Sequence, residues 1–460
     1  TLLRKLGLEG LRLIQPAPEV AMLPAPQVVG YLRKYWKIEA GLESNLDIRS
    51  IGLSALPREV AVLGILLEEL RLDRNRIMDL TFEIGHLWRL HTLSASNNQL
   101  VSLPFELNHL TNLTLLDVKH NNIAALPNIP GLRMLTMLDA SHNNLTGIPL
   151  NIKNWTSLKT LNLHHNILIN LPSAIGDLYK LVDMDVSSNR LNALPKAFAK
   201  LTRLGTLNAK HNSMTRVPNE LALMTGLTSL LIAGNRILAL PPAMGYCTNI
   251  SQLELSLSHL LAPPAETHGG GVHSMFSYLR ALHDAQFEQR LVLAGWELAA
   301  FPLDGYYLTG LTYLNLQHNQ LRVIPHALGA YRHLINLQLD HNRIETIPEQ
   351  IGKLHASLTE LSCSHNVLQR ITSGIFQLTS LIRLTLARNK IKALPETLSK
   401  LTMLRFLDLD HNQIQAIPDS LAILSRLRDL YFEGNPIAYV SPESFINCKG
   451  LRLLKVSISE

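Results

Sequence analysis

Hydrophobic residues recur along the chain at a fixed spacing. The segment Leu90-x-x-Leu93-x-Ala95-x-x-Asn98-x-Leu100 is followed by further segments with the same spacing. Alternation of leucines with variable residues predicts a short strand with one buried face. Such a strand cannot bury that face alone, so we expect successive strands to stack in parallel and share one core.

An asparagine ends each predicted strand, and these asparagines recur every 23 residues, with single-residue adjustments before Asn143 and Asn366. An asparagine side chain carries both donors and an acceptor, so it can satisfy backbone groups at the turn and link neighbouring repeats. The predicted structural ladder comprises Asn75, Asn98, Asn121, Asn143, Asn166, Asn189, Asn212, Asn235, Asn319, Asn342, Asn366, Asn389, Asn412 and Asn435.

A proline follows most ladder positions six residues later, as at Pro104, Pro172 and Pro195. Its fixed φ and missing donor suit the start of a short helical return. The residues after Pro195 show the 3–4 spacing of a helical turn or two. Each repeat is therefore predicted to be a strand, a turn and a short helical return.

The register breaks at two places. The ladder position holds Leu11 and Ile51 around the first break, and Ser258 and Trp296 around the second. These gaps of 40 and 38 residues are each longer than one repeat. Something other than a repeat must fill them.

Both gaps contain an apolar helical pattern, at residues 28–36 and 272–282, and both patterns include Tyr-Leu-Arg. We expect each helix to cover the end of one run before the next begins. The predicted organisation is the end of a preceding block with a capping helix (1–41), a first run with its break helix (42–291), and a second run with a C-terminal cap (292–460).

Three consecutive glycines, Gly269 to Gly271, precede the second helix. Glycines at a helix start can cradle a phosphate. The lysine and the serine or threonine of a nucleotide-binding loop are missing here, so a flexible connector is the favoured interpretation.

The 23-residue unit with Leu-Pro after the asparagine turn resembles the intracellular leucine-rich-repeat proteins, a group that includes Ras-pathway scaffolds and polarity proteins. One repeat ends Glu433-Gly434-Asn435-Pro436, and a Tyr-Leu-Arg helix lies in mid-chain. These two features resemble one member of this group more than the others. The resemblance implies an α/β leucine-rich-repeat solenoid, a curved horseshoe of about 17–18 repeats with strands on the concave side and short helical segments on the convex side. It implies protein binding on the concave face and no catalytic residues.

Composition is that of a folded chain, with 47% apolar and 17% charged residues. The net charge of +6 comes from 42 basic and 36 acidic residues scattered among one another, which disfavours a nucleic-acid partner. No apolar run reaches the 18 residues of a membrane span, so membrane insertion is not expected.

Three dispersed cysteines, Cys247, Cys363 and Cys448, are too few for a disulfide framework or a zinc site and favour a reducing, cytoplasmic location. Cys363 occupies a leucine position of a predicted strand, so we interpret it as a small core residue. No hydrolase, metalloprotease or dinucleotide motif occurs, so no catalytic residue, metal or cofactor is predicted.

Variable strand positions are the ones that neither core nor turn dictates, so binding is expected there. Acidic and aromatic residues gather at these positions near the C-terminus, with a second acidic pair in the first run. The candidate partner-binding residues are Phe406, Asp408, Asp410, Asp429, Tyr431, Glu433, Asp183 and Asp185. Aromatic anchors surrounded by charge are typical of hot spots, and we hypothesise that Phe406, Asp408, Tyr431 and Glu433 contact a basic partner. The alternative is an ordinary solvated strand face.

Histidines form a column immediately before the ladder asparagines: His120, His142, His165, His211, His318, His341, His365 and His411. A metal site needs three or four converging ligands with supporting neighbours. A straight column provides neither, so we interpret these histidines as turn residues of the repeat consensus.

Two classes of function remain open. The first is a non-catalytic scaffold or adaptor, either in Ras or phosphatase signalling or within a large assembly that is cytoskeletal or axonemal. The second is the recognition arm of a larger kinase, ubiquitin ligase or GTPase. The chain begins with Thr1 in mid-repeat, which implies a longer parent array and keeps the second class open.

Overall fold

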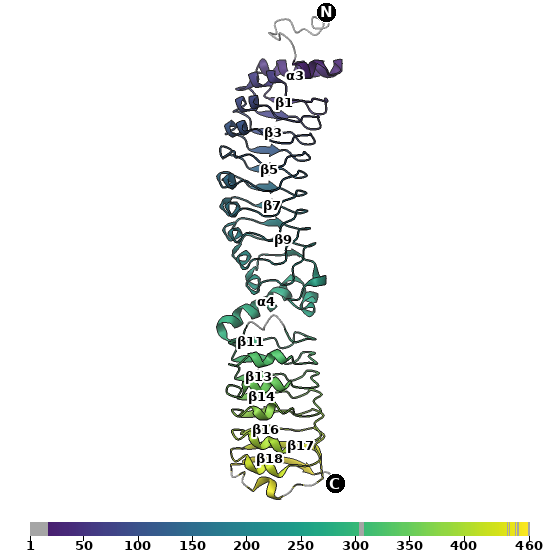
Figure 1. Ribbon diagram of the computed structural model, residues 1–460, viewed down its shortest axis with the longest axis vertical. Helices are drawn as coiled ribbons and strands as arrows, with labels where there is room; N and C mark the ends of the chain where they lie inside the picture. Colours follow the sequence, from purple (N-terminus) through teal and green to yellow (C-terminus); the bar gives the residue numbers. More distant parts are fainter. Residues whose placement is uncertain are drawn as a thin grey trace, which may run out of the picture. The chain divides into compact units, whose positions relative to one another are not determined.

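The computed structural model describes residues 17–302, 308–438, 440, 442–446, 448 and 450–458. The described residues form two compact units, one of residues 17–241 with 247–259, the other of residues 242–246 with 260 onward. Each unit contains a stack of short strands, one per repeat (Figure 1). The expected break position Leu11 lies outside the described residues.

The first unit begins with two helices, α2 (Pro18–Ala21) and α3 (Ala25–Glu39). The expected helix at residues 28–36 lies within α3. Ten parallel strands follow in sequence order: β1 (Asn45–Asp47), β2 (Glu69–Arg71), β3 (Thr92–Ser94), β4 (Leu115–Asp117), β5 (Met137–Asp139), β6 (Thr160–Asn162), β7 (Asp183–Asp185), β8 (Thr206–Asn208), β9 (Ser229–Leu231) and β10 (Gln252–Glu254).

The second unit contains helix α4 (Gly271–Glu288), which includes the expected helix at residues 272–282. Its eight parallel strands again follow sequence order: β11 (Arg290–Val292), β12 (Tyr313–Asn315), β13 (Asn336–Gln338), β14 (Glu360–Ser362), β15 (Arg383–Thr385), β16 (Phe406–Asp408), β17 (Asp429–Ile437) and β18 (Leu453–Ile458). With ten strands before them, this gives 18 strands in the described residues, which confirms the predicted parallel repeat architecture.

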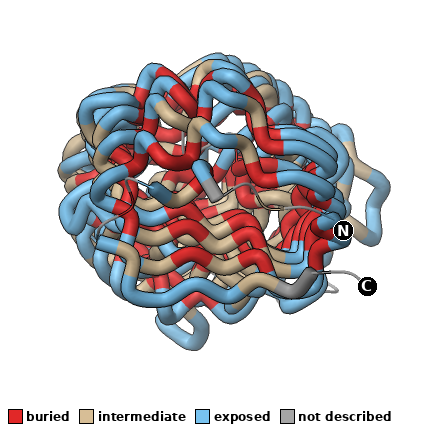
Figure 2. The backbone as a smooth tube through the Cα atoms, turned by 90° about the horizontal axis from the view of Figure 1, so that it is seen from below, coloured by how far each residue is buried: buried red, intermediate tan, exposed pale blue. Residues whose placement is uncertain are grey.

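The central leucine of each strand forms the core. Leu93, Leu116 and Leu138 are at most 1% exposed and pair directly across β3, β4 and β5. The residues on either side of each leucine point away from the core, as the two-residue period of a strand requires. Figure 2 shows buried positions on the inner side of the backbone and exposed positions around the outside.

Prolines precede most of the returns, as the sequence predicted, and the helical segments are of the 3-10 type. Pro195 is extended (φ −65°, ψ 141°) and leads into η6 (Lys196–Lys200), which buries Phe198. The returns are η1 (Arg58–Leu63), η2 (Phe82–His86), η3 (Phe105–His109), η4 (Leu150–Asn154), η5 (Ser173–Asp177), η6, η7 (Asn219–Leu223), η8 (Pro242–Tyr246), η9 (Leu257–His259), η10 (Ala265–Gly270), η12 (His326–Ala330), η13 (Glu349–Leu354), η14 (Ile375–Gln377), η15 (Glu396–Lys400), η16 (Asp419–Ile423) and η17 (Pro442–Phe445).

Changes in repeat length are absorbed in these returns. The 24-residue repeat before Asn366 has a six-residue 3-10 segment, η13, where the standard segment has five. The 22-residue repeat before Asn143 has no 3-10 segment between β4 and β5. Strand register is unchanged in both cases, because the return is the part of the repeat that faces solvent.

The ladder asparagines are buried, each between 5% and 9% exposed. Asn212 is representative: its Nδ2 donates to the carbonyl oxygens of Val186 at 3.0 Å and Ala209 at 3.1 Å. Its Oδ1 accepts a bond of 2.9 Å from the N–H of Leu191. One side chain thus satisfies backbone groups in two successive repeats.

The residue before each ladder asparagine has a left-handed backbone. All eight histidines of the column have φ between 51° and 55°, and Gly234 takes the same place with φ 72°. Histidine and asparagine are enriched among the non-glycine residues that adopt this conformation. Turn geometry therefore accounts for the recurrence of histidine here.

Helix α4 packs within the second unit, against η8, η10 and β11. Its buried Tyr278 meets Trp296 edge to face, with ring centroids 5.7 Å apart. This helix was predicted to cover the end of one run before the next begins, and it contacts both η8 and η10, which precede it, and β11, which follows it. The glycine triplet is part of this junction, since Gly269 and Gly270 lie in η10 and Gly271 begins α4.

Candidate protein-binding surface

Strands β15 to β18 present their outward side chains on one surface, which we call the sheet face. Phe406 and Asp408 flank the buried Leu407 on β16, and Asp429 and Tyr431 flank Leu430 on β17. Parallel pairing places Phe406 opposite Asp429 and Asp408 opposite Tyr431. Residues from successive repeats are thereby brought side by side.

The two aromatic residues predicted as anchors lie close together. The ring centroids of Phe406 and Tyr431 are 5.3 Å apart at an interplanar angle of 43°. Both side chains are half-buried, so each ring keeps part of its surface in solvent. This tilted, offset contact is one that aromatic pairs prefer.

Cations cover these rings from the neighbouring strands. The Arg383 guanidinium carbon lies 4.0 Å from the Phe406 ring centroid, and Lys455 Nζ lies 5.7 Å from that of Tyr431. Arg383 and Phe406 occupy equivalent positions of β15 and β16. Sequence reasoning missed both cations, although the matching repeat position of Arg383 was a signal that could have identified it.

The carboxylates form a chain of backbone contacts at the strand ends. The N–H of Asp410 donates to Asp408 Oδ1 at 3.1 Å, and the N–H of Glu433 donates to Asp410 Oδ1 at 2.6 Å. Burial raises the pKa of Asp408, and burial followed by repulsion from Asp408 and Glu433 raises the pKa of Asp410. Among the described residues, no lysine or arginine forms an ion pair with Asp408, Asp410, Asp429 or Glu433.

The same strand-end contact recurs in the first unit. Asp117, Asp139 and Asp185 each accept the N–H two residues later, at 3.1, 3.1 and 2.8 Å. Aspartate side chains form such local turns readily. The recurrence of aspartate at this position, which the sequence analysis treated as free for binding, therefore has a structural reason as well. Asp183, the other candidate on β7, is exposed.

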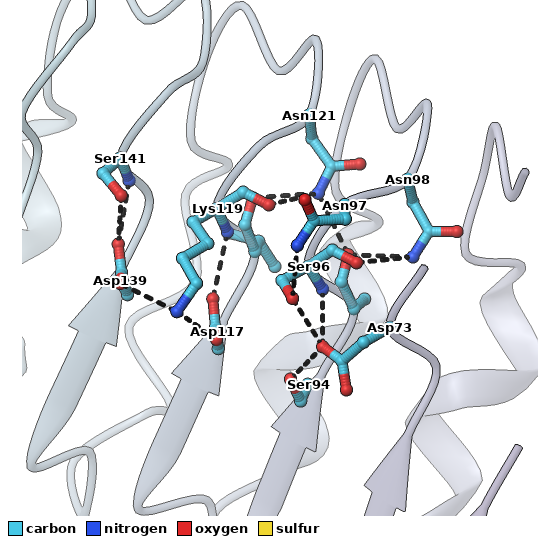
Figure 3. A network of polar contacts seen from close by, with 12 residues as sticks. Asp73, Ser94, Ser96, Asn97, Asn98, Asp117, Lys119, Asn121, Asp139 and Ser141 are labelled. Atoms are coloured by element: carbon cyan, nitrogen blue, oxygen red, sulfur yellow. Dashed lines mark hydrogen bonds and ion pairs between the residues drawn. The ribbon is translucent and has the colours of Figure 1, made fainter. Parts of the chain in front are cut away.

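A polar network crosses the strand ends of β2 to β5 (Figure 3). Asp73 accepts bonds from the Ser96 N–H at 3.0 Å and the Ser96 hydroxyl at 2.7 Å. Lys119 Nζ lies 3.2 Å from Asp117 and 3.6 Å from Asp139. The first contact links the repeat of β2 to that of β3, and the second links β4 to β5, on the outward side where the leucine core makes no contribution.

Beside this network lies a hollow of about 780 Å³. Its charged lining residues include Lys34, Asp47, Arg49, Arg71, Asp73 and Arg74. Arg49 pairs with Asp47 at 2.9 Å and lowers the pKa of Asp47 to about 2. Sequence reasoning did not select this hollow, because its lining comes from α3 and from the ends of β1 to β4, which only folding brings together.

The cysteines are buried and unpaired with one another. Burial raises the pKa of the Cys247 thiol to about 11, and burial followed by the charge of Asp340 raises that of Cys363. A thiol protonated at neutral pH is a poor nucleophile. This agrees with the interpretation of Cys363 as a core residue.

Within the described part of the chain, no helix has the length and apolar character needed to span a membrane.

Two family models, both described as leucine-rich repeat, match residues 356–414 and 310–330. These segments cover strands β12, β14, β15 and β16 and the turns that follow them, where the buried leucines and ladder asparagines have the geometry described above. The chain has the fold of a leucine-rich-repeat solenoid. The repeats outside the matched segments share the same strand, turn and return.

Solved structures of leucine-rich-repeat proteins are similar over most of the chain. A leucine-rich-repeat protein of Leptospira interrogans is 28% identical over 92% of this chain and 98% of its own, with a TM-score of 0.47. YopM from Yersinia enterocolitica is 22% identical over 94% of this chain and 77% of its own, with a TM-score of 0.39. The plant peptide hormone receptor RGFR1, solved in complex with RGF2, is 26% identical over 91% of this chain and 63% of its own, with a TM-score of 0.43.

A comparison with curated proteins gives no match. The matching models describe a repeat and not a catalytic domain. Leucine-rich-repeat solenoids commonly mediate protein–protein interactions through the extended surface that their stacked strands create.

Proposed function

We propose that this solenoid is a non-catalytic scaffold that binds a partner protein on the sheet face of β15 to β18. The observation that carries the proposal is the pair Phe406 and Tyr431, 5.3 Å apart, next to carboxylates that have no cationic partner among the described residues. Binding energy at interfaces concentrates on such aromatic anchors, with polar groups around them.

The partner segment that fits this surface is basic. Asp408 and Asp410 are partly desolvated, and each already accepts a backbone N–H on one oxygen. An arginine from a partner could pair with their remaining oxygens without displacing an internal ion pair. Arg383 and Lys455, which cover the aromatic rings, would direct that arginine toward the strand ends by repulsion.

The setting we propose is cytoplasmic, within a stable multi-protein assembly of the cytoskeletal or axonemal kind. Buried, unpaired thiols suit a reducing compartment. A charged fraction of only 17% suits a lasting assembly better than electrostatically steered encounters. The narrower resemblance, to leucine-rich repeat-containing protein 40, belongs to this proposal and rests on the Glu433–Pro436 segment and the Tyr-Leu-Arg helix.

The experiment compares affinity capture by the unaltered chain, by the double variant Phe406→Ala with Tyr431→Ala, and by Tyr313→Ala. Tyr313 is the matched control, because it begins β12 with Arg290 4.1 Å from its ring centroid but has no carboxylate cluster beside it. We expect partners captured by the unaltered chain to be retained by the control and lost by the double variant.

A purified partner should then bind the double variant at least tenfold more weakly, the loss typical of a hot spot of about 2 kcal/mol. Its affinity for the unaltered chain should fall as salt is raised, since basic groups contact carboxylates. Equal capture by all three proteins would contradict the proposed surface.

A further inference from the structure

Two adjacent histidines, His164 and His165, follow the end of strand β6, and no other histidine pair is adjacent in the chain. His165 belongs to the column before the ladder asparagines, and His142 is its neighbour in the preceding repeat. His164 lies one residue earlier, on the outward side of the strand end. This repeat alone therefore places a histidine beside the column.

The His164 ring stands nearly perpendicular to rings that are stacked on one another. His142 stacks on His120 and on His165, with ring centroids 4.0 and 4.4 Å apart. His164 stands edge-on to His142 at 4.7 Å and to His165 at 5.0 Å. One ring nitrogen from each of His142, His164 and His165 lies within 4.8 Å of the other two.

Stacking alone does not produce such convergence. In the second unit His318, His341 and His365 stack at 4.3 and 4.0 Å, but no histidine precedes them in their own turns. In the part of the chain that the structure describes, the three first-unit histidines form the only group of three histidine, cysteine or acidic side chains with ligand atoms this close. The additional histidine, His164, makes the difference between a column and a cluster.

The surroundings suit a cation. His142 and His164 are half-buried, so their rings are partly shielded from water. The carboxylates of Asp139 and Asp185 act electrostatically on His164 from β5 and β7. Asp139 is buried, accepts a hydrogen bond from the Ser141 hydroxyl at 2.6 Å, and has Lys119 Nζ 3.6 Å away.

We propose that His142, His164 and His165 bind one divalent transition-metal ion, with Zn²⁺ as the ion that three imidazoles and an open fourth position suit best. Zn–N bonds of about 2.0–2.1 Å in a tetrahedron separate the nitrogens by about 3.3 Å. The Nδ1 atoms of His164 and His165 are 2.8 Å apart and share a hydrogen bond, so binding an ion requires side-chain rotations that break this bond and bring the three nitrogens to that spacing. The same donors also accept Ni²⁺ and Cu²⁺.

A bound ion would join the turns after β5 and β6, because His142 and the histidine pair come from successive repeats. Its fourth position faces solvent at His165, which is exposed, and is open to water or to a side chain of a binding partner. The site is independent of the proposed sheet face in the second unit, so either proposal can fail alone.

Titration calorimetry with ZnCl₂ tests the site in the full chain, His164→Ala and His341→Ala. His341 is the matched control, since it belongs to a stacked trio without an additional histidine. The chain has 19 histidines, so weak background binding is present in all three proteins and the comparison isolates the specific site.

We expect one tight Zn²⁺ equivalent in the unaltered chain and in His341→Ala, and at least a tenfold weaker affinity in His164→Ala. Zn²⁺ should raise the melting temperature of the unaltered chain and of His341→Ala, and not that of His164→Ala. Circular dichroism without metal checks that His164→Ala is folded. Identical titrations for the unaltered chain and His164→Ala, or an equal loss in His341→Ala, would overturn the site.

Discussion

Arg280 donates two hydrogen bonds to the carbonyl oxygen of Gly245, from Nε at 3.0 Å and from Nη2 at 2.8 Å. The guanidinium carbon of Arg280 also lies 5.2 Å from the ring centroid of Tyr246. One arginine of α4 thereby fixes the helix on η8. Arg33 is the equivalent residue of the Tyr-Leu-Arg segment in α3, and it is exposed.

Replacing Arg280 by alanine should therefore weaken the second unit, while Arg33→Ala should change little. Loss of a charged double hydrogen bond to a carbonyl costs about 1–3 kcal/mol, whereas an exposed substitution stays within about 0.5 kcal/mol. Denaturant unfolding measures both changes, and hydrogen exchange of the α4 amides should rise only in Arg280→Ala. Equal effects of the two variants would contradict separate roles for the two arginines.

Replacing Asn212 by alanine should cost about 1–3 kcal/mol, because buried carbonyl groups of Val186 and Ala209 and the N–H of Leu191 lose their partner. Ser258→Ala is the control, since Ser258 occupies the ladder position at the break and is exposed. Urea unfolding followed by circular dichroism should show a clear loss for the first variant and almost none for the second. A similar loss in both would show that the break position still belongs to the ladder.

Replacing Asp408 by asparagine should stabilise the chain at neutral pH. Burial raises the pKa of Asp408 above its ordinary value of 3.8, so the folded state holds this proton more tightly than the unfolded state. The resulting stabilisation is complete below that ordinary value and is lost as pH rises through the folded-state pKa. Asparagine keeps an oxygen for the Asp410 N–H and carries no charge to desolvate.

The free energy of unfolding of Asp408→Asn should exceed that of the unaltered chain by about 0.5 kcal/mol at pH 7. This difference should shrink toward pH 4, and urea unfolding at several pH values measures it. Asp183→Asn, at an exposed position, controls for removal of one negative charge. A gain that is the same at every pH would contradict burial of Asp408 as its cause. Partner binding should weaken in the same Asp408 variant, which separates its effect on binding from its effect on stability.

The repeat, the ladder and the places of the two break helices could be predicted because each depends on residues close together in the chain. A strand of three residues, a left-handed turn and a proline-led return each have a local signature, as at Asn98, His120 and Pro195. Nearest-neighbour stacking then repeats one local solution along the array.

The double role of the strand-end aspartates could not be predicted. Asp408 looked free because it belongs neither to the core nor to the turn consensus, yet its Oδ1 accepts a backbone N–H. A carboxylate that accepts a backbone N–H of its own turn and one that has no internal contact have the same sequence pattern. Only the side-chain geometry distinguishes them.

The sequence by itself determined the period, the buried leucines and the asparagine ladder, because backbone hydrogen bonding and burial impose the same demand on every repeat. The tertiary structure decided which outward side chains meet, as with Arg383 over Phe406 and His164 against His142. Such contacts depend on ring orientation and on the register between strands more than twenty residues apart. A repeat pattern fixes which positions are neighbours, but the rotamers and charges that occupy them determine whether those neighbours form a ring stack, an ion pair or a site.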